Sequence, residues 1–329
     1  MQQKELINLM KKVKSILIIT VLLFGGLLGM NLPKQIVQAD DSPVICLGTS
    51  LTDNQRQGTI KALSNPLNDN SYHTITITGQ DLVQYLNPSG ANFTNTSGVW
   101  SSAMIQKTAQ GSGINVHILD YQGHNNITTI TANQYKNAAL TAGITDANIY
   151  VTSAVPIDGS GALAGVYSAY SKNGKNLNQS QVNAAQDEMG TLSKITKENQ
   201  NKKGYSDAQL NNAVAGAKQE MGKIGNNVSD SQIHDIVNNQ ININHLGDVI
   251  NNNQKEQIIN ILIKIRDSGA LKDHHFKDQA DALSKNIEKN AKGIFDKINT
   301  TENRNLFEQI WDAITSFFSG LVAGFSNSK

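Results

Sequence analysis

Strand-type and helix-type hydrophobic spacings follow one another most clearly in residues 112–170. In residues 114–119, Ile114, Val116 and Ile118 alternate with other side chains, and this period of two predicts a strand. An extended run at residues 99–107 precedes it, and a glycine-containing turn lies between them. This arrangement predicts that the two runs form a β-hairpin.

The next segment has the pattern of a helix followed by a strand. Residues 131–134 (Thr-Ala-Asn-Gln) have the spacing of a capping box, and Gly143 is suited to end the helix that begins there. Residues 149–155 form an apolar run, which Pro156 ends because proline has no N–H to donate to a sheet. A strand, a helix and a strand in this order predict a crossover unit.

Weaker patterns surround this central unit. Strands are predicted at residues 44–47 and 74–78, a capped helix begins after Thr52, and a short helix covers residues 79–86. We therefore predict an α+β domain over residues 40–171, with a small sheet, a hairpin and a crossover helix.

The composition changes after Lys172, where helical patterns replace β-branched runs. Cap signals at Ser206 and Ser229 begin two of the predicted helices, and a further helix covers residues 276–298. The segment Glu-Met-Gly occurs at 188–190 and again at 220–222, as in a duplicated helix. Residues 172–329 are thus predicted to be an all-helical C-terminal region.

The last predicted helix, at residues 305–325, is amphipathic with a broad apolar face. Either this face packs on the helical region, or it docks a partner. It has few basic residues for anionic lipid and is too interrupted to span a membrane. The residues that would dock a partner are Trp311, Phe317, Phe318 and Leu321.

Residues 1–39 have the features of a signal peptide. Four lysines near the start precede an apolar run at residues 16–28, and Val37-Gln38-Ala39 places small residues where signal peptidase requires them. The alternative is an uncleaved anchor, but the run is shorter than the ~20 residues of a membrane span. We predict a secreted chain that begins at Asp40 and has no transmembrane span.

Charge and cysteine content narrow the class of protein further. The whole chain carries a formal charge of +1, and residues 1–39 contain five lysines and one glutamate, so their removal leaves −3. A mildly acidic chain is poorly suited to binding nucleic acid. Cys46 is the single cysteine, so no internal disulfide can form, and we expect it to be buried in a strand.

The segment Asp158, Gly159, Ser160 and Gly161 lies between the predicted strand and the next helix. Free N–H groups at a helix start can bind a ligand, and ligands in crossover sheets gather beyond the carboxyl ends of strands. Because Asp158 would repel an anion, a neutral glycan suits this turn better than a phosphate. The alternative is a helix cap with glycines that allow tight packing.

No motif of enzyme chemistry or metal binding is present. The chain has no G-x-S-x-G, H-E-x-x-H, Walker or calcium-loop pattern, and neither His274-His275 nor the group around His117 has metal-ligand spacing. We predict no metal site, no cofactor and no catalytic residues.

Four segments carry a resemblance to a known family. They are LGTSLTDNQ, SSAMIQKTAQGSGINVHI, YKNAALTAGITDANIYVTSAVPI and ALAGVYSAY, within residues 44–246. They resemble the domain of unknown function 1002 family, secreted or surface proteins of Gram-positive bacteria. The resemblance implies an extracytoplasmic location and supplies no catalytic residues. The family pattern has alanine at the position of Gly161.

These features favour a secreted protein of the cell envelope that acts as a non-enzymatic binding or scaffold module. Its expected partner is an envelope protein or a wall glycan. The alternative is an envelope hydrolase or transferase whose site is assembled from residues far apart in the sequence.

Overall fold

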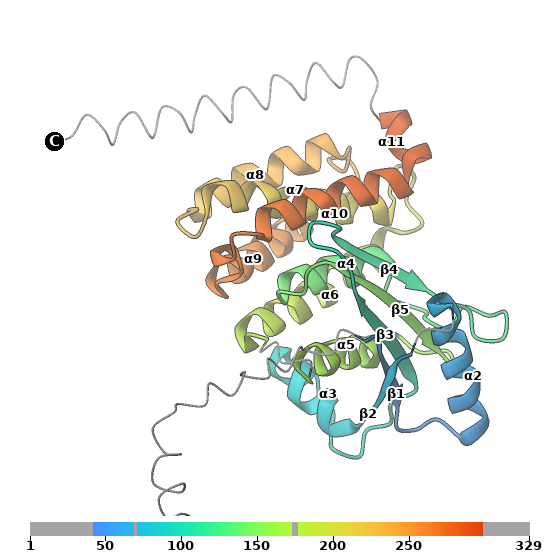
Figure 1. Cartoon of the computed structure of the whole chain (residues 1–329). Helices are drawn as coiled ribbons and strands as arrows, with labels where there is room; N and C mark the ends of the chain where they lie inside the picture. Colours follow the sequence, from blue (N-terminus) through green and yellow to red (C-terminus); the bar gives the residue numbers. More distant parts are fainter. Residues whose placement is uncertain (1–41, 69–70, 173–176, 299–329) are drawn as a thin grey trace, which may run out of the picture. The chain divides into compact units, whose positions relative to one another are not determined.

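The computed structural model describes residues 42–68, 71–172 and 177–298. Its strands are β1 (Val44–Gly48), β2 (His73–Ile77), β3 (Ser101–Lys107), β4 (Ile114–Ile118) and β5 (Ala147–Ser153). Its α-helices are α2 (Asp53–Ser64), α3 (Gly79–Leu86), α4 (Ala132–Thr141), α5 (Ser160–Lys172), α6 (Gln179–Asn199), α7 (Asp207–Ile224), α8 (Asp230–Ile243), α9 (Asn252–Asp267), α10 (Phe276–Asn290) and α11 (Lys292–Ile298). The predicted class, α+β followed by a helical region, is confirmed (Figure 1).

The five strands form one mixed sheet in the order β2-β1-β3-β5-β4. Strands β1 and β2 are parallel, β4 and β5 are parallel, and β3 runs antiparallel to both of its neighbours, β1 and β5. The predicted hairpin between residues 99–107 and 114–119 is therefore wrong, because β5 lies between β3 and β4. Strand β5 pairs with β3 over seven positions, from Ser101↔Ser153 to Lys107↔Ala147. Strand β4 is only five residues long, so a hairpin of β3 with β4 would form fewer pairs.

The predicted crossover is confirmed, since α4 connects the parallel strands β4 and β5. Its predicted capping box is present: the Thr131 hydroxyl accepts from the Gln134 N–H, and the Gln134 side chain accepts from the Thr131 N–H. The caps predicted at Thr52 and Ser229 form in the same way. These contacts are local, which is why the sequence alone identified them.

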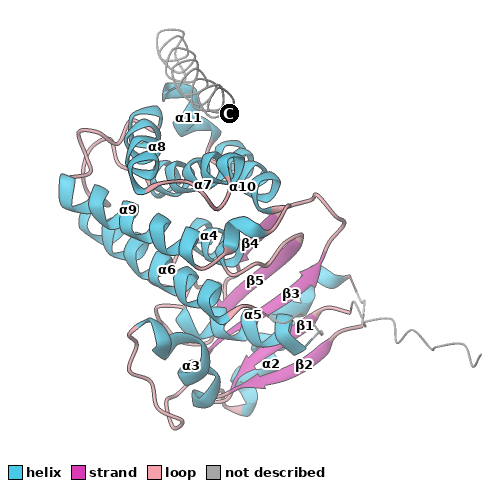
Figure 2. Ribbon diagram, turned by 90° about the vertical axis from the view of Figure 1, so that its left-hand side faces the viewer, coloured by secondary structure: helices cyan, strands magenta, loops and turns pink. Residues whose placement is uncertain are grey.

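The two faces of the sheet are covered unequally. Helix α2 packs on one face and encloses a small core of Ile45, Leu47, Leu63, Leu67 and Met104. On the other face lie α4 and α5, with α3 packed against α5, and the much larger core begins there. Figure 2 shows α5 in front of the strands and α2 behind them.

The helical region contains α6 to α11 and continues the larger core. The single helix predicted at residues 276–298 is two helices, α10 and α11, which separate at Ala291. The predicted helix at residues 305–325 lies outside the described residues, as does the segment 173–176 near the predicted domain boundary.

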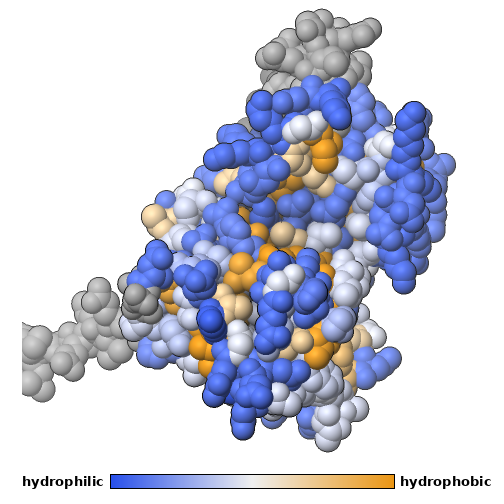
Figure 3. Space-filling model, turned by 90° about the vertical axis from the view of Figure 1, so that its right-hand side faces the viewer, coloured by the Kyte–Doolittle hydropathy of each residue, from blue (hydrophilic) through white to orange (hydrophobic). Residues whose placement is uncertain are grey.

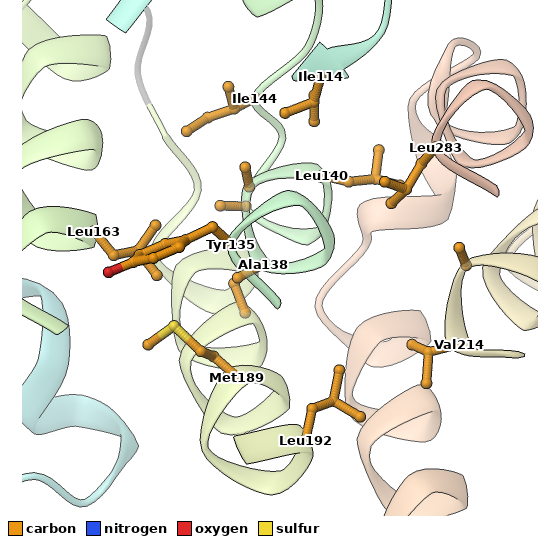
Figure 4. Packing of buried hydrophobic residues seen from close by; sticks show 14 of the residues in the cluster. Ile114, Tyr135, Ala138, Leu140, Ile144, Leu163, Met189, Leu192, Val214 and Leu283 are labelled. Atoms are coloured by element: carbon orange, nitrogen blue, oxygen red, sulfur yellow. The ribbon is translucent and has the colours of Figure 1, made fainter. Parts of the chain in front are cut away.

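Helix α4 lies at the centre of the larger core. Figure 4 shows side chains from β4 (Ile114), α5 (Leu163), α6 (Met189), α7 (Val214) and α10 (Leu283) gathered around it. Every residue of α4 from Gln134 to Thr141 is buried. The α+β part and the helical region therefore share one core through this helix. That residues 40–171 fold without the helical region stays a prediction, which expression of that fragment tests.

Candidate functional site

The glycine-rich turn predicted as a ligand site begins α5. Asp158 is exposed, and its carboxylate accepts hydrogen bonds from the backbone N–H of Ser160 (3.0 Å) and from the Ser160 hydroxyl (3.0 Å). The Asp158 carboxylate thus satisfies the N–H of Ser160, the first residue of α5. The carboxylate that a ligand would meet here is already held by local donors.

The two glycines of the turn are in close contact with side chains. Gly159 has a φ of +105°, and a Cβ there would lie 2.2 Å from the hydroxyl oxygen of Tyr135. That hydroxyl donates to the Gly159 carbonyl (2.7 Å), and burial raises the pKa of Tyr135 well above its usual value. A Cβ at Gly161 would lie 2.9 Å from Ser101 Oγ. Both glycines therefore permit close packing, and their role in ligand binding stays a prediction.

Ser101 adds a polar group to this turn. Its side chain is buried, and its Oγ has no hydrogen-bond partner among the described residues. A buried hydroxyl without a partner costs free energy, so this atom is one that a water or a ligand hydroxyl would stabilise.

Beside the turn, the structure assembles a cluster around Asp207, the first residue of α7. Thr131 Oγ1 lies 3.0 Å from both carboxylate oxygens, and the side-chain amides of Asn133 (3.2 Å) and Asn211 (2.9 Å) donate to them. Burial raises the pKa of the Asp207 carboxyl, while these hydrogen bonds act in the opposite direction. A carboxyl group with a raised pKa beside hydroxyls is suited to general acid chemistry.

The turn and the Asp207 cluster are neighbours. The Ile130 N–H donates to the Asp158 carbonyl (3.2 Å), and the next residue, Thr131, contacts Asp207. The starts of α4, α5 and α7 therefore meet. Asp207 does not stand out in the sequence because it follows the helix cap at Ser206, and an acidic residue in the first turn of a helix is common there.

A second polar cluster, fully buried, joins α4, α6 and α7. Lys218 Nζ and Glu188 Oε1 form an ion pair at 2.6 Å, and both side chains are 0% exposed. The Thr141 hydroxyl donates to Glu188 (2.6 Å), and the Lys218 ammonium donates to the Asn137 carbonyl (2.9 Å). Burial lowers the pKa of Lys218, while Glu188 favours its charged form. This cluster has no exposed face through which a substrate could reach it.

The repeated Glu-Met-Gly segment contributes to this region, although the repeat by itself does not indicate what its glutamates do. Both of its glutamates are buried: Glu188 belongs to the ion pair, and Glu220 accepts from the side chain of Gln240. A glutamate followed by an apolar residue in a helical pattern carries no sign of burial, so only packing identifies these acids as interior groups.

The single cysteine is buried as predicted. Cys46 is 0% exposed, its Sγ donates to the Gly165 carbonyl at 3.2 Å, and burial raises the thiol pKa far above its usual range. A thiolate is the reactive form, so this cysteine is unsuited to act as a nucleophile.

Two further features are missing from the described parts of the chain. There, no three His, Cys, Asp or Glu side chains converge on a point where they could hold a metal ion. No helix in those parts is both long and apolar enough to cross a membrane. The docking residues predicted in the last helix, Trp311, Phe317, Phe318 and Leu321, lie outside the described residues.

Comparison with known proteins identifies relatives without a described activity. Over 287 residues the chain is 27% identical to the uncharacterized protein YpuA of Bacillus subtilis (strain 168), a match that covers 86% of this chain and 89% of that protein. No solved structure matches the chain significantly. The sequence profile described as "Protein of unknown function (DUF1002)" matches residues 47–283, so the chain belongs to the DUF1002 family.

Proposed function

We propose that this protein is a non-enzymatic binding or scaffold module that acts outside the cytoplasm, at the cell envelope of a Gram-positive bacterium. The features of a signal peptide in residues 1–39 support the location. The proposed partner is a wall glycan or an envelope protein. Nucleic acid is a poor partner, because the chain from Asp40 onward has a formal charge of −3.

One observation carries the proposal of a binding role. The interior thiol and the interior ion pair, which could otherwise act as a nucleophile or as an acid and base, have no access to solvent. Cys46, Glu188 and Lys218 are each 0% exposed and bonded to other protein groups. An enzyme needs its nucleophile or its acid and base within reach of a substrate. Here these groups hold helices and strands together instead.

Capture of envelope components by the exported protein tests the binding role. We expect the purified protein to retain a wall or envelope component reproducibly, and N-terminal sequencing of the exported form to begin at Asp40. If the exported form keeps Met1, the signal-peptide assignment fails. If no envelope component is retained, the binding role fails.

The Asp207 cluster favours a second candidate, an envelope hydrolase or transferase. This carboxyl has a raised pKa, it is partly exposed, and hydroxyl and amide groups from α4 and α7 surround it. Asp207→Asn keeps the size of the side chain and removes its acid. If the protein cleaves or transfers wall polymers, this change abolishes the activity, whereas Asp53→Asn, at the exposed first residue of α2, serves as the matched control.

A further inference from the structure

A row of amide side chains crosses three strands on the face of the sheet that α2 covers. Gln106 of β3 is paired with Asn148 of β5, and Asn148 is paired with Asn115 of β4. Directly paired side chains project from the same face, so these three amides lie side by side, with adjacent strands about 4.8 Å apart. All three are partly exposed. They form what we call the amide row.

The hydrogen bonds that lead into the amide row and those along it all run in one direction. Lys136 donates to Asn286 of α10 (2.6 Å), and the Asn286 amide donates to Asn115 (2.8 Å). Asn115 then donates to Asn148 (3.4 Å), and Asn148 donates to Gln106 (3.3 Å). Chains of this kind polarise their members, so the N–H groups at the far end become stronger donors. Each side-chain amide carries two N–H groups, and the row uses one from Asn115 and one from Asn148.

An aromatic pair lies next to the amide row. His117 and Tyr150 are paired across β4 and β5, two residues further along each strand, and so project from the same face about 7 Å away. Their rings stack, with centroids 5.1 Å apart and planes inclined by 19°. His117 is exposed and belongs to β4, an outer strand of the sheet. One face of its ring therefore meets Tyr150, while the side chain as a whole remains exposed to solvent.

The remainder of this sheet face is occupied. Tyr150 packs against the small core beneath α2, which includes Met104, its partner on β3. The side of the molecule on which β4 and α2 lie in Figure 1 mixes hydrophilic residues with separate apolar patches (Figure 3).

We propose that the amide row and the stacked pair His117–Tyr150 form a binding platform for a neutral glycan. This inference rests on the proposed binding function and deepens it by assigning a site and a ligand class. A sugar ring offers an apolar C–H face that packs on an aromatic ring, and neighbouring hydroxyls that can pair with one amide group. The platform supplies both kinds of contact side by side on rigid strands.

Other ligand classes suit the platform less well. The amides are neutral, and the one cation in the chain of hydrogen bonds, Lys136, is 3% exposed, so an anion gains little there. A peptide that extended the sheet would need the free edge of β4, but α10 lies against that strand. Neutral donors aligned across three strands fit a polymer of hydroxyl-bearing rings.

Chemical-shift mapping with a soluble tetramer of N-acetylglucosamine tests the platform. We expect the side-chain amide signals of Gln106, Asn115 and Asn148 to shift on titration. We expect His117→Ala to weaken binding about fivefold or more, since it removes the ring on which the apolar face of the sugar packs. Asn148→Thr retains strand propensity and should weaken binding similarly. Thr76→Ala, an exposed residue of β2 at the opposite edge of the sheet, is the matched control and should bind normally.

Thermal unfolding of each variant distinguishes lost binding from lost folding. If the tetramer shifts only signals from Gly159 to Ala162, the site is the glycine-rich turn and the platform is overturned. Binding of wall peptides without binding of the tetramer overturns the glycan assignment. If the double variant His117→Ala/Asn148→Thr retains envelope components as the unmodified protein does, the platform fails but the binding function stands. If the unmodified protein retains none, the binding function itself fails.

Discussion

The buried cluster between α4, α6 and α7 and the amide row on the sheet use similar polar side chains in opposite ways. In the buried cluster, Glu188, Lys218, Asn137 and Thr141 find their partners within the protein. In the amide row, the groups are partly exposed and retain N–H groups beyond those used within the row.

The difference follows from the cost of burial. A charge or an amide removed from water must regain its interactions within the protein, so a buried cluster is stable only if it is closed. A partly exposed row is under no such requirement, because water satisfies its remaining donors. Its remaining N–H donors can therefore bind a ligand. We infer that the buried cluster stabilises the fold and that the amide row serves recognition.

Breaking the buried ion pair should have the largest effect. Lys218→Met leaves Glu188 buried without its cation, and we expect it to lower the free energy of unfolding by about 3–5 kcal/mol. Denaturant unfolding measures this. The double variant Lys218→Met/Glu188→Leu removes both charges and should recover much of the loss. A single variant as stable as the unmodified protein would contradict the assignment of this pair as a structural element.

Disrupting the tight packing of Gly159 against Tyr135 should have the next largest effect. Gly159→Ala combines the strain of a positive φ with a Cβ 2.2 Å from the Tyr135 hydroxyl, and we expect a loss of about 2–4 kcal/mol in unfolding free energy. Gly123→Ala is the control, since Gly123 also has a positive φ (+83°) but no neighbouring atom within 4 Å of the position that a Cβ would take. It should lose only about 1–2 kcal/mol. Equal losses of unfolding free energy in the two variants would show that the Tyr135 side chain moves aside without destabilising the protein.

Lys136 belongs to α4, the helix that also carries Asn137 of the buried cluster, and it donates to Asn286, which in turn donates to Asn115 of the amide row. Burial lowers its pKa from 10.5 to about 8. Below pH 8 the folded state carries a costly buried charge. Between pH 8 and 10.5 the unfolded chain binds the proton and the folded protein releases it, so this group's contribution to stability rises with pH.

We therefore expect the stability of the unmodified protein, relative to Lys136→Met, to increase by up to about 2 kcal/mol from pH 8 to pH 10. Urea unfolding of both proteins across this range measures the difference, which cancels the titration of groups that they share. The difference should stay constant from pH 6 to 7. A decrease above pH 8 would mean that the ammonium form is the one that the fold stabilises.

The smallest expected effect compares one asparagine from each cluster. Asn148→Ala, in the amide row, should change the free energy of unfolding by only about 0.5 kcal/mol, because water replaces its partners. Asn137→Ala, in the buried cluster, removes a side chain that is 0% exposed and bonded to Lys218 and Asn211, and should cost about 1–3 kcal/mol. Equal losses in thermal or denaturant unfolding would remove the distinction between the clusters.

The sequence predicted those features of the fold that depend on near neighbours. Caps at Thr52, Thr131 and Ser229 form as expected because their donors and acceptors lie three residues apart. The crossover through α4 followed from the order of strand and helix patterns. The hairpin failed because strand pairing joins distant segments, and the insertion of β5 between β3 and β4 leaves no local mark.

The candidate sites divide in the same way. The turn at Asp158–Gly161 was visible because glycines and a capping side chain cluster in the sequence. Asp207 and Glu188 were not, since an acid at a helix start or within a helical pattern is ordinary. The amide row could not be predicted, because its members are scattered along the chain: Gln106 and Asn148 are 42 residues apart. They become neighbours only through the register of the strands.

By itself, the sequence determined the helix starts, the crossover, the burial of Cys46 and the fold class, and it predicts export. Only the tertiary structure decided the strand order, the central place of α4 and the partners of the buried ion pair of Glu188 and Lys218. The physical reason is the separation in sequence of the interacting groups. The hydrogen bonds of caps and turns join residues a few positions apart, whereas burial and strand register arise when distant segments pack against each other and exclude water.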